Sequence, residues 1–130
     1  MIIDDKLLNG LQQQARASER KRVHLDLRNN ADEDSQRMLN VMEPGTVVPI
    51  HRHVDTLETV VILRGKMDEI YYDAEGREKQ RIHLDASKGC YGLQIPMGQY
   101  HSVEALTPCT IIEIKAGKYD PVKTEDFLKL

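Results

Sequence analysis

The chain has 130 residues and a formal net charge of −3, and 30% of its residues are charged. This length favours one domain with enough core to fold without disulfides, and the acidic balance disfavours general binding to nucleic acid or anionic membranes. The N-terminus lacks the basic start of a signal peptide, and the longest aliphatic run, Val60 to Leu63, is too short to span a bilayer. We therefore expect a soluble cytoplasmic protein in which Cys90 and Cys109 are reduced, with a disulfide between them as the alternative.

Residues 4–20 are predicted to form a helix that Asp4 or Asp5 caps. Its apolar residues recur at helical spacing: Leu7, Leu8, Leu11 and Ala15. This stripe must pack on one end of the domain or on a partner subunit. The basic cluster from Arg16 to Arg22 is interpreted as the cation-rich end of the helix, which the helix dipole favours; a phosphate-binding patch is the alternative. Residues 1–22 are thus assigned to an N-terminal helical segment.

From residue 23 onward the pattern changes to short segments rich in β-branched and aromatic residues. The first alternates apolar Val23, Leu25 and Leu27 with polar residues, as a half-buried strand does. Turn signals separate several of the segments that follow: RMLNVM, TVVPIHRH, ETVVILR, KMDEIYYD, QRIHLD, YGLQIP, HSVEAL and CTIIEIK. About eight or nine short strands at this spacing are typical of an antiparallel sandwich or barrel. We predict an all-β barrel over residues 23–130, whose tail wraps the surface and ends in a short helical turn.

One short stretch, PIHRHVDTLE, concentrates candidate metal ligands. His51 and His53 would lie on the same face of a strand, and Glu58 would begin the next strand. His101, which follows the turn signal PMG, could supply a third nitrogen. Three imidazoles and one carboxylate suit a divalent Mn, Fe, Co, Ni or Zn ion. Four such ligands would leave two positions open on an octahedral metal.

The spacing of these residues is similar to the first conserved motif of the cupin superfamily. The stretch GTVVPIHRHVDTLETVVILRG reads G-x₅-H-x-H-x₄-E-x₆-G, from Gly45 to Gly65. PMGQYH resembles the second cupin motif through Pro96, Gly98 and His101, although Cys90 replaces its leading glycine and Ala105 its final asparagine. The resemblance implies an antiparallel double-sheet jelly-roll β-barrel that binds one metal through His51, His53, Glu58 and His101.

Nearly the whole chain resembles the WbuC family of cupin-fold metalloproteins. The resemblance rests on the segment around Arg37 and on the Lys-x-Gly-x-Tyr-x-Pro run from Lys115 to Pro121. It implies a bacterial protein associated with gene clusters for O-antigen, and hence lipopolysaccharide, and a homodimer.

Four further residues are candidates for substrate chemistry. On CTIIEIK, Glu113 and Lys115 share one face; if this face is interior, Glu113 could move protons and Lys115 could hold an anionic substrate, whereas an exposed face would carry an ordinary ion pair. Arg37 and Tyr72 are predicted to bind substrate, Arg37 because guanidinium recognises carboxylate or phosphate. His24 and His83 lack partners at useful spacing, so they are assigned to surface or core packing.

Three functions are compatible with this sequence. The first is a metal-dependent enzyme, of the isomerase or epimerase type, acting on a small sugar or sugar-derived acid in surface-polysaccharide synthesis. The second is an iron-dependent dioxygenase. The third is a non-catalytic module that binds a metabolite and regulates another protein. In each case the partner is a small, anionic molecule.

Overall fold

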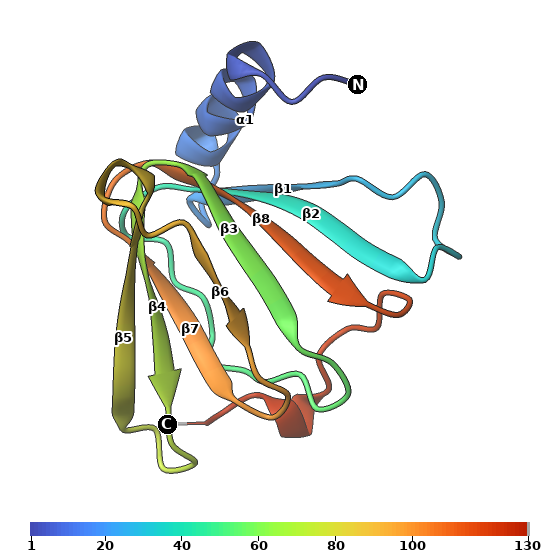
Figure 1. Ribbon diagram of the computed structural model, residues 1–130, viewed down its shortest axis with the longest axis vertical. Helices are drawn as coiled ribbons and strands as arrows, with labels where there is room; N and C mark the ends of the chain where they lie inside the picture. The colour runs from blue at the N-terminus through green and yellow to red at the C-terminus, as the bar shows by residue number, and fades with distance from the viewer. Residues whose placement is uncertain (130) are drawn as a thin grey trace.

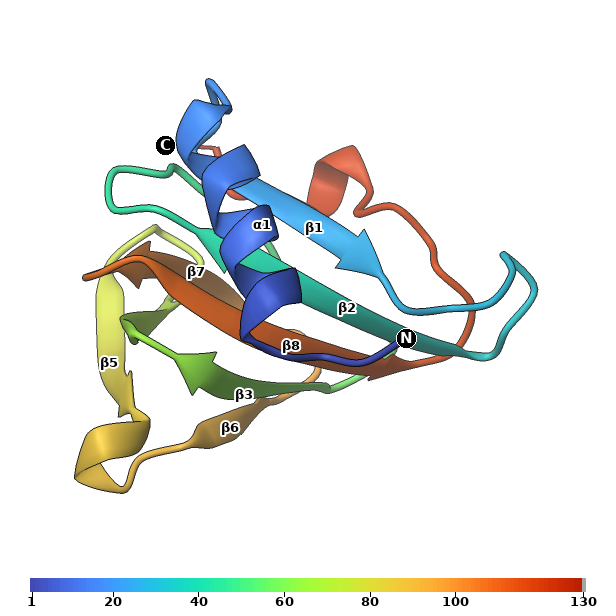
Figure 2. The same cartoon turned by 90° about the horizontal axis from the view of Figure 1, so that it is seen from above.

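Two antiparallel sheets face each other, and one helix lies outside them (Figures 1 and 2). The structure is a computed structural model that describes residues 1–129. Its elements are α1 (Asp5–Ala17), β1 (Arg22–Asp26), β2 (Ser35–Met42), β3 (Glu58–Arg64), β4 (Lys66–Tyr72), β5 (Glu78–Asp85), β6 (Gly92–Ile95), β7 (Tyr100–Ala105) and β8 (Cys109–Ala116), with 3₁₀ turns at Ala86–Lys88 and Thr124–Asp126.

The strand order is β1-β2-β8-β3-β6 in the larger sheet and β5-β4-β7 in the smaller one. All strand pairs are antiparallel. Both sheets contribute to one apolar core: Met42, Val60, Ile62, Met67, Leu84, Ile95, Ala105, Cys109 and Ile111. The predicted all-β, double-sheet fold with a short N-terminal helix is confirmed. Cys90 and Cys109 are free thiols, and no helix among residues 1–129 has the length and hydrophobicity that crossing a bilayer requires.

Helix α1 packs on the outer face of the larger sheet, across β1, β2 and β8 (Figure 2). Asp4 caps its start, because Oδ1 of this residue accepts a hydrogen bond of 3.0 Å from the backbone N–H of Leu7. The helix ends at Ala17, three residues before the predicted end at residue 20, since Ser18 is already extended. A second apolar cluster joins the helix to the sheet: Leu8, Leu11, Ala15, Leu39 and Val41.

Strands β1 and β2 turn their apolar sides toward this helix. Val23, Leu25 and Leu27 pack against the helix cluster. Because side chains alternate along a strand, the intervening residues face the space between the sheets. That inner side is polar on β1, where Arg22 and His24 line a cavity.

The predicted strand TVVPIHRH is wrong. Between β2 and β3 the chain runs without regular strand pairing, apart from isolated bridges at His51. Pro49 has no backbone N–H to donate to a ladder. Instead, the backbone of Ile50–Arg52 bonds to the C-terminal segment, where Arg52 N–H donates to Asp126 and Leu128 N–H donates to Ile50. We call residues 118–129 the C-terminal strap; it includes the predicted helical turn, while Leu130 lies outside the described residues.

Candidate metal centre

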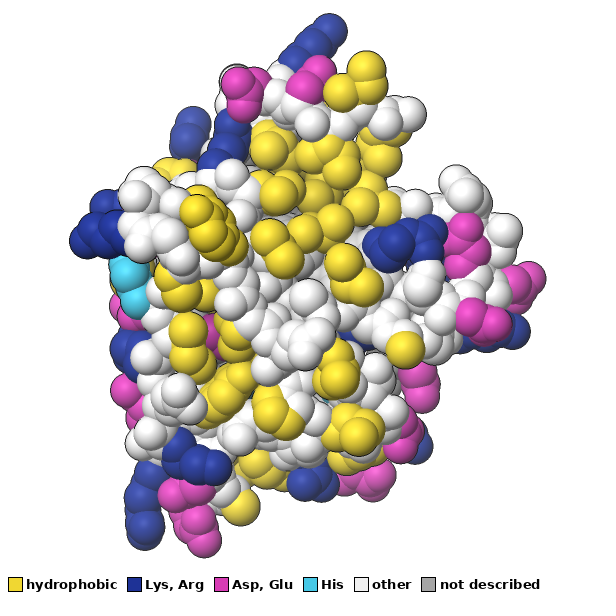
Figure 3. Space-filling model, viewed as in Figure 1, with side chains coloured by type: hydrophobic (Ala, Val, Ile, Leu, Met, Phe, Trp, Pro, Cys, Tyr) yellow, Lys and Arg dark blue, Asp and Glu magenta, His cyan; other side chains and the backbone are white. Residues whose placement is uncertain are grey.

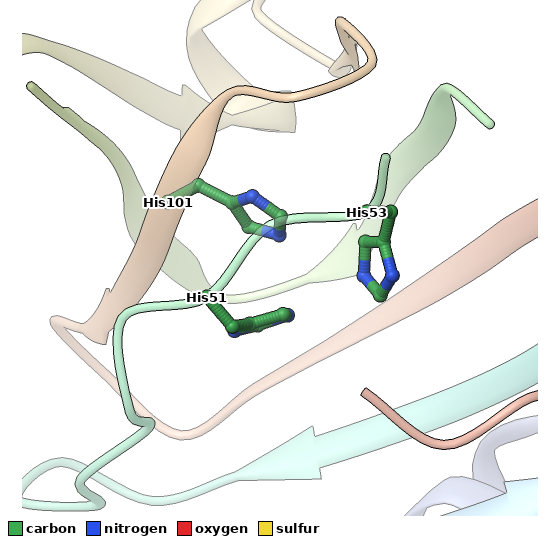
Figure 4. A group of neighbouring side chains, drawn as sticks. All are labelled: His51, His53 and His101. Carbon is green, nitrogen blue, oxygen red and sulfur yellow. The ribbon is translucent and has the colours of Figure 1, made fainter. Parts of the chain in front are cut away.

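Three histidines from two distant parts of the chain point toward one another (Figure 4). His51 and His53 lie on the loop between β2 and β3, and His101 lies near the start of β7. One ring nitrogen from each lies within 4.8 Å of the other two, so the group could hold a metal ion. The loop is held against β7 by two backbone hydrogen bonds that His51 and His101 exchange, of 3.1 and 2.8 Å.

Backbone carbonyls orient two of the imidazoles. His51 Nδ1 lies 2.9 Å from the carbonyl oxygen of Pro49, and His101 Nδ1 lies 2.9 Å from that of Gln99. A carbonyl can only accept, so both rings carry their proton on Nδ1. This leaves each Nε2 with its lone pair free, which is the form that binds a metal.

Glu58 brings a carboxylate to the same point. Its side chain is buried, and its Oε2 lies 3.5 Å from Nε2 of both His53 and His101. His53 Nε2 and Glu58 Oε2 are buried without a hydrogen-bond partner among the described residues. Buried polar atoms without partners are costly and rare. A divalent cation would satisfy both atoms, so this donor set fits a metal.

The site favours neutral imidazoles and an ionised carboxylate. Burial, and then the charge of His101, lowers the pKa of His51 to about 4. Burial, and then the charge of Lys115, lowers the pKa of His53 to about 4. For Glu58, burial acts to raise the pKa, but the interaction with the nearby His101 and the charge of Lys115 outweigh it, and the pKa falls to about 2. These are the protonation states that metal ligation requires.

The histidines and Glu58 line a cavity of about 460 Å³ between the sheets, a size typical of small-molecule sites. Its walls are mixed. Apolar side chains form part of the lining: Met38, Met42, Val48, Val103, Ile111 and Val122. Polar and charged side chains from strands of both sheets, from the loop with His51 and His53, from the segments that flank β1 and from the C-terminal strap form the remainder. The cavity therefore offers space beside the candidate metal centre for a ligand with both polar and apolar surface.

Glu113 and Lys115 line this cavity, so the alternative of an exposed outer face is wrong. Asn40 Nδ2 donates a hydrogen bond of 2.7 Å to Glu113 Oε1. Burial, and then the negative charge of Glu58, raises the pKa of Glu113 to about 8. Lys115 lies directly opposite Glu58 in the pairing of β3 with β8. A protonated carboxyl and an ammonium group thus lie beside the ligand cluster.

Sequence analysis missed one buried carboxyl, Glu69 on β4. Its side chain is 1% exposed and lines the cavity, and its Oε2 has no hydrogen-bond partner among the described residues. Burial, and then the charges of Glu58 and Glu113, raises its pKa well above the ordinary value. A signal was present, because Glu69 follows the core residue Met67 by two positions and therefore lies on the same face of the strand.

Arg37 and Tyr72 are not among the residues that line the cavity, which corrects the prediction that they bind substrate there. Arg37 lies on the other face of β2 and pairs with Glu33 at 2.7 Å. Tyr72 lies opposite Glu78, whose charge acts with burial to raise the pKa of its phenol. Tyr71 packs on the core instead, because alternation sends neighbouring side chains to opposite faces.

The two remaining histidines behave differently from each other. His83 lies on the smaller sheet, where its Nδ1 is 2.8 Å from Asp68 Oδ1. It takes no part in the cavity, in agreement with its assignment to packing. His24 was given the same assignment, but it lines the cavity from β1.

Comparison with solved structures supports the fold. The chain is similar to the capsular polysaccharide assembling protein CapF from Staphylococcus aureus, with 20% identity, a TM-score of 0.60, and coverage of 76% of this chain and 30% of CapF. It is similar to a cupin-2 domain containing protein from Shewanella frigidimarina, with 24% identity, a TM-score of 0.55, and coverage of 72% and 79%. KdgF from Halomonas sp. gives 16% identity, a TM-score of 0.58, and coverage of 76% and 81%.

These similarities establish the cupin fold. The chain spans only 28% and 30% of the length of the two CapF structures that it matches. No curated protein matches it significantly in sequence. The sequence model of one family, described as a domain of unknown function (DUF6016), matches residues 3–84. This match includes α1, the loop with His51 and His53, and Glu58, and on this basis the chain belongs to the DUF6016 family.

Proposed function

We propose that this protein binds one divalent transition metal through His51, His53, Glu58 and His101, and that it acts on a small anionic molecule beside the metal. The observation that carries the proposal is the convergence of three imidazoles and a buried carboxylate, with two of the converging atoms unsatisfied. Imidazole nitrogen and carboxylate oxygen suit Mn, Fe, Co, Ni and Zn.

Three cavity residues besides the metal ligands have a defined part in this proposal. When bound, the metal supplies Lewis acidity that polarises an oxygen of the substrate. Glu113 has a carboxyl pKa of about 8, so it can give and take a proton near neutral pH. Lys115 attracts the anionic group of the substrate, since its ammonium lines the same cavity. Burial raises the pKa of Glu69 well above its ordinary value, so this carboxyl can donate a hydrogen bond to the ligand in its protonated form.

The reaction we favour is an isomerisation or epimerisation of a sugar or sugar-derived acid in surface-polysaccharide synthesis. Such a reaction moves a proton at the carbon next to a carbonyl, which needs one polarising group and one acid–base group. Two similarities support the biological context. The chain resembles WbuC-type cupins, and a structural neighbour is described as a capsular polysaccharide assembling protein.

The first test is elemental analysis of protein purified without added metal or chelator. We expect about one metal per chain. The double variant His51→Ala/His101→Ala should lose it, because two of the four ligands are gone, whereas His83→Ala should retain it. If the wild-type protein holds no metal even after reconstitution, the metal-dependent function is wrong.

Metal identity then separates the chemistries. Zinc, nickel or manganese would support Lewis-acid catalysis. Iron together with substrate-dependent oxygen uptake would replace it with the dioxygenase. In Glu113→Gln, metal content should stay unchanged while turnover is lost; a variant with unchanged turnover would remove Glu113 from the mechanism.

We also propose that the protein is a homodimer. Figure 3 shows apolar side chains gathered on the molecular surface from α1 down over the larger sheet. Ile3, Leu63 and Ile114 are among the exposed apolar residues, each at least 40% exposed. Light scattering coupled to size-exclusion chromatography should give twice the chain mass of 14.9 kDa, and the monomer mass would contradict the proposal.

A further inference from the structure

The inner face of β1 carries charge where a two-sheet fold normally buries apolar side chains. Arg22, His24 and Asp26 line the cavity, and Val23 and Leu25 pack under the helix on the opposite face. An inner face of this kind needs a polar neighbour. The cavity supplies this neighbour. Its lining includes β1, which is an edge strand of the larger sheet, and Glu58 of β3, which lies three strands away.

Two arginines in this region have no acidic partner in the ion pairs that the described residues form. Arg28 is paired with Asp26 at 2.7 Å, and Arg16 is paired with Glu43 at 2.9 Å. Neither pair includes Arg20 or Arg22, although both of these residues line the cavity. The positive charges of these two arginines repel each other: burial and then the charge of Arg20 lower the pKa of Arg22, and the charge of Glu113 only partly offsets them. Two like charges held together favour an anion between them.

The backbone around these arginines is fixed rather than loose. Thr46 Oγ1 donates a hydrogen bond of 2.6 Å to the carbonyl oxygen of Arg20, and the N–H of Glu43 donates one of 2.9 Å to that of Lys21. The N–H of Arg20 donates to Ser18 Oγ at 3.2 Å. These hydrogen bonds hold the start of β1 against the loop after β2. The backbone that carries the two arginines at the cavity is therefore fixed in place.

We propose that Arg20, Arg22 and His24 form an anion subsite for the phosphate group of an elongated ligand whose other end reaches the histidine cluster. Each guanidinium group offers a pair of N–H donors, and two such pairs match the double negative charge and the several oxygens of a phosphate. A carboxylate has two oxygens and one charge, so one guanidinium group is enough for it. Strand β1 is three strands from β3 in the larger sheet, which corresponds to about 14 Å. A ligand that contacts both ends is therefore longer than a small acid.

The phosphate subsite is independent of the metal, whereas the reach of the ligand to the histidine cluster rests on the proposed function. The probe is inorganic phosphate, titrated calorimetrically into the full-length protein at low salt. We expect binding to wild type, and a loss of about tenfold or more in affinity for Arg20→Gln/Arg22→Gln. Arg77→Gln/Lys79→Gln changes the net charge equally at exposed positions on the hairpin of β4 and β5, and it should bind phosphate as wild type does.

Three further measurements keep the outcomes distinct. The His51→Ala/His101→Ala variant should still bind phosphate, and a loss there would place phosphate on the metal instead and overturn the subsite. His24→Gln, a milder change, should weaken binding in the same direction. Acetate should bind much more weakly than phosphate; equal binding would overturn the phosphate assignment. No phosphate binding by wild type, or equal binding by the arginine variant, would overturn the proposal while leaving the metal result unaffected.

Discussion

Two glycine residues determine the turns on either side of the histidine motif. Gly45 and Gly65 frame the histidine motif, and both adopt positive φ, of +92° and +82°. Gly65 connects β3 of the larger sheet to β4 of the smaller one. A Cβ atom at this position would lie 2.2 Å from the carbonyl oxygen of Pro108. The glycine in this part of the motif is therefore required by a close backbone approach as well as by its φ angle.

Replacing Gly65 with alanine should lower the free energy of unfolding by about 3 kcal/mol, from the strain of positive φ and the overlap with backbone. Gly10→Ala is the matched control, since no atom lies within 4 Å of its added Cβ. It should raise stability by about 0.5–1 kcal/mol, because alanine is the better helix former. Urea denaturation of both variants measures the difference, and similar values for the two would refute this account of Gly65.

At the level of elements, α1 covers the side of β1 and β2 that faces away from the metal centre. Gln12 and Arg16 secure it to Glu43, with Gln12 Nε2 2.6 Å and Arg16 Nε 2.9 Å from the carboxylate oxygens. Leu11 is 8% exposed in the apolar cluster beneath the helix. The helix therefore stabilises the larger sheet, and no residue of α1 lines the cavity.

Leu11→Ala should lower the free energy of unfolding by about 2–4 kcal/mol, because it leaves a void in this cluster. Metal content should remain that of wild type, since the helix and the cavity lie on opposite faces of β2. Gln13→Ala, at an exposed helix position, should change stability by less than about 0.5 kcal/mol. Loss of metal from folded Leu11→Ala would show that helix packing and the metal loop are coupled.

For the whole molecule, buried histidines with lowered pKa values and a buried carboxyl with a raised pKa make the free energy of unfolding depend on pH. The histidines destabilise the fold at low pH, and the carboxyl destabilises it at high pH. His51 and His53 have pKa values lowered from 6.5 to about 4, so the folded state binds fewer protons than the unfolded state within that range. Glu113 has a pKa raised from 4.5 to about 8, so the folded state binds more protons within that range. Stability is lost as pH falls through the first window and as it rises through the second.

The metal-free protein should consequently be most stable at about pH 6.5, because the two histidines outweigh the one carboxyl below that pH and only the carboxyl acts above it. Glu113→Gln should reduce the decline in stability toward pH 8.5, because the group that must ionise is removed. It should also steepen the loss of stability below about pH 6.5, because the contribution of Glu113 that opposes the histidines in that range is removed with it. Thermal denaturation of chelator-treated protein across this range provides the measurement. A stability maximum above pH 8 would show that the raised pKa of Glu113 is absent.

The sequence by itself determined the all-β fold, the start of the helix and the three histidines that converge with Glu58. These follow from spacing, from turn residues and from side-chain chemistry, which are local properties. The alternation of side chains along a strand left open whether Glu113 and Lys115 face inward. A repeat of two residues defines two faces of the strand but does not say which face is inside.

Only the tertiary structure decided the inner face of each strand. On β8 the core places Ile111 and Glu113 inward. On β1 and β2 the helix covers the apolar side, so the polar side becomes the inner one; Arg22 enters the cavity, and Arg37 is excluded from it. The predicted strand around His51 failed for a related reason, since its backbone bonds to residues distant in sequence, among them His101 of β7 and the C-terminal strap, rather than to a neighbouring strand over a regular register. Long-range packing, rather than local pattern, therefore selects the residues that surround the metal centre.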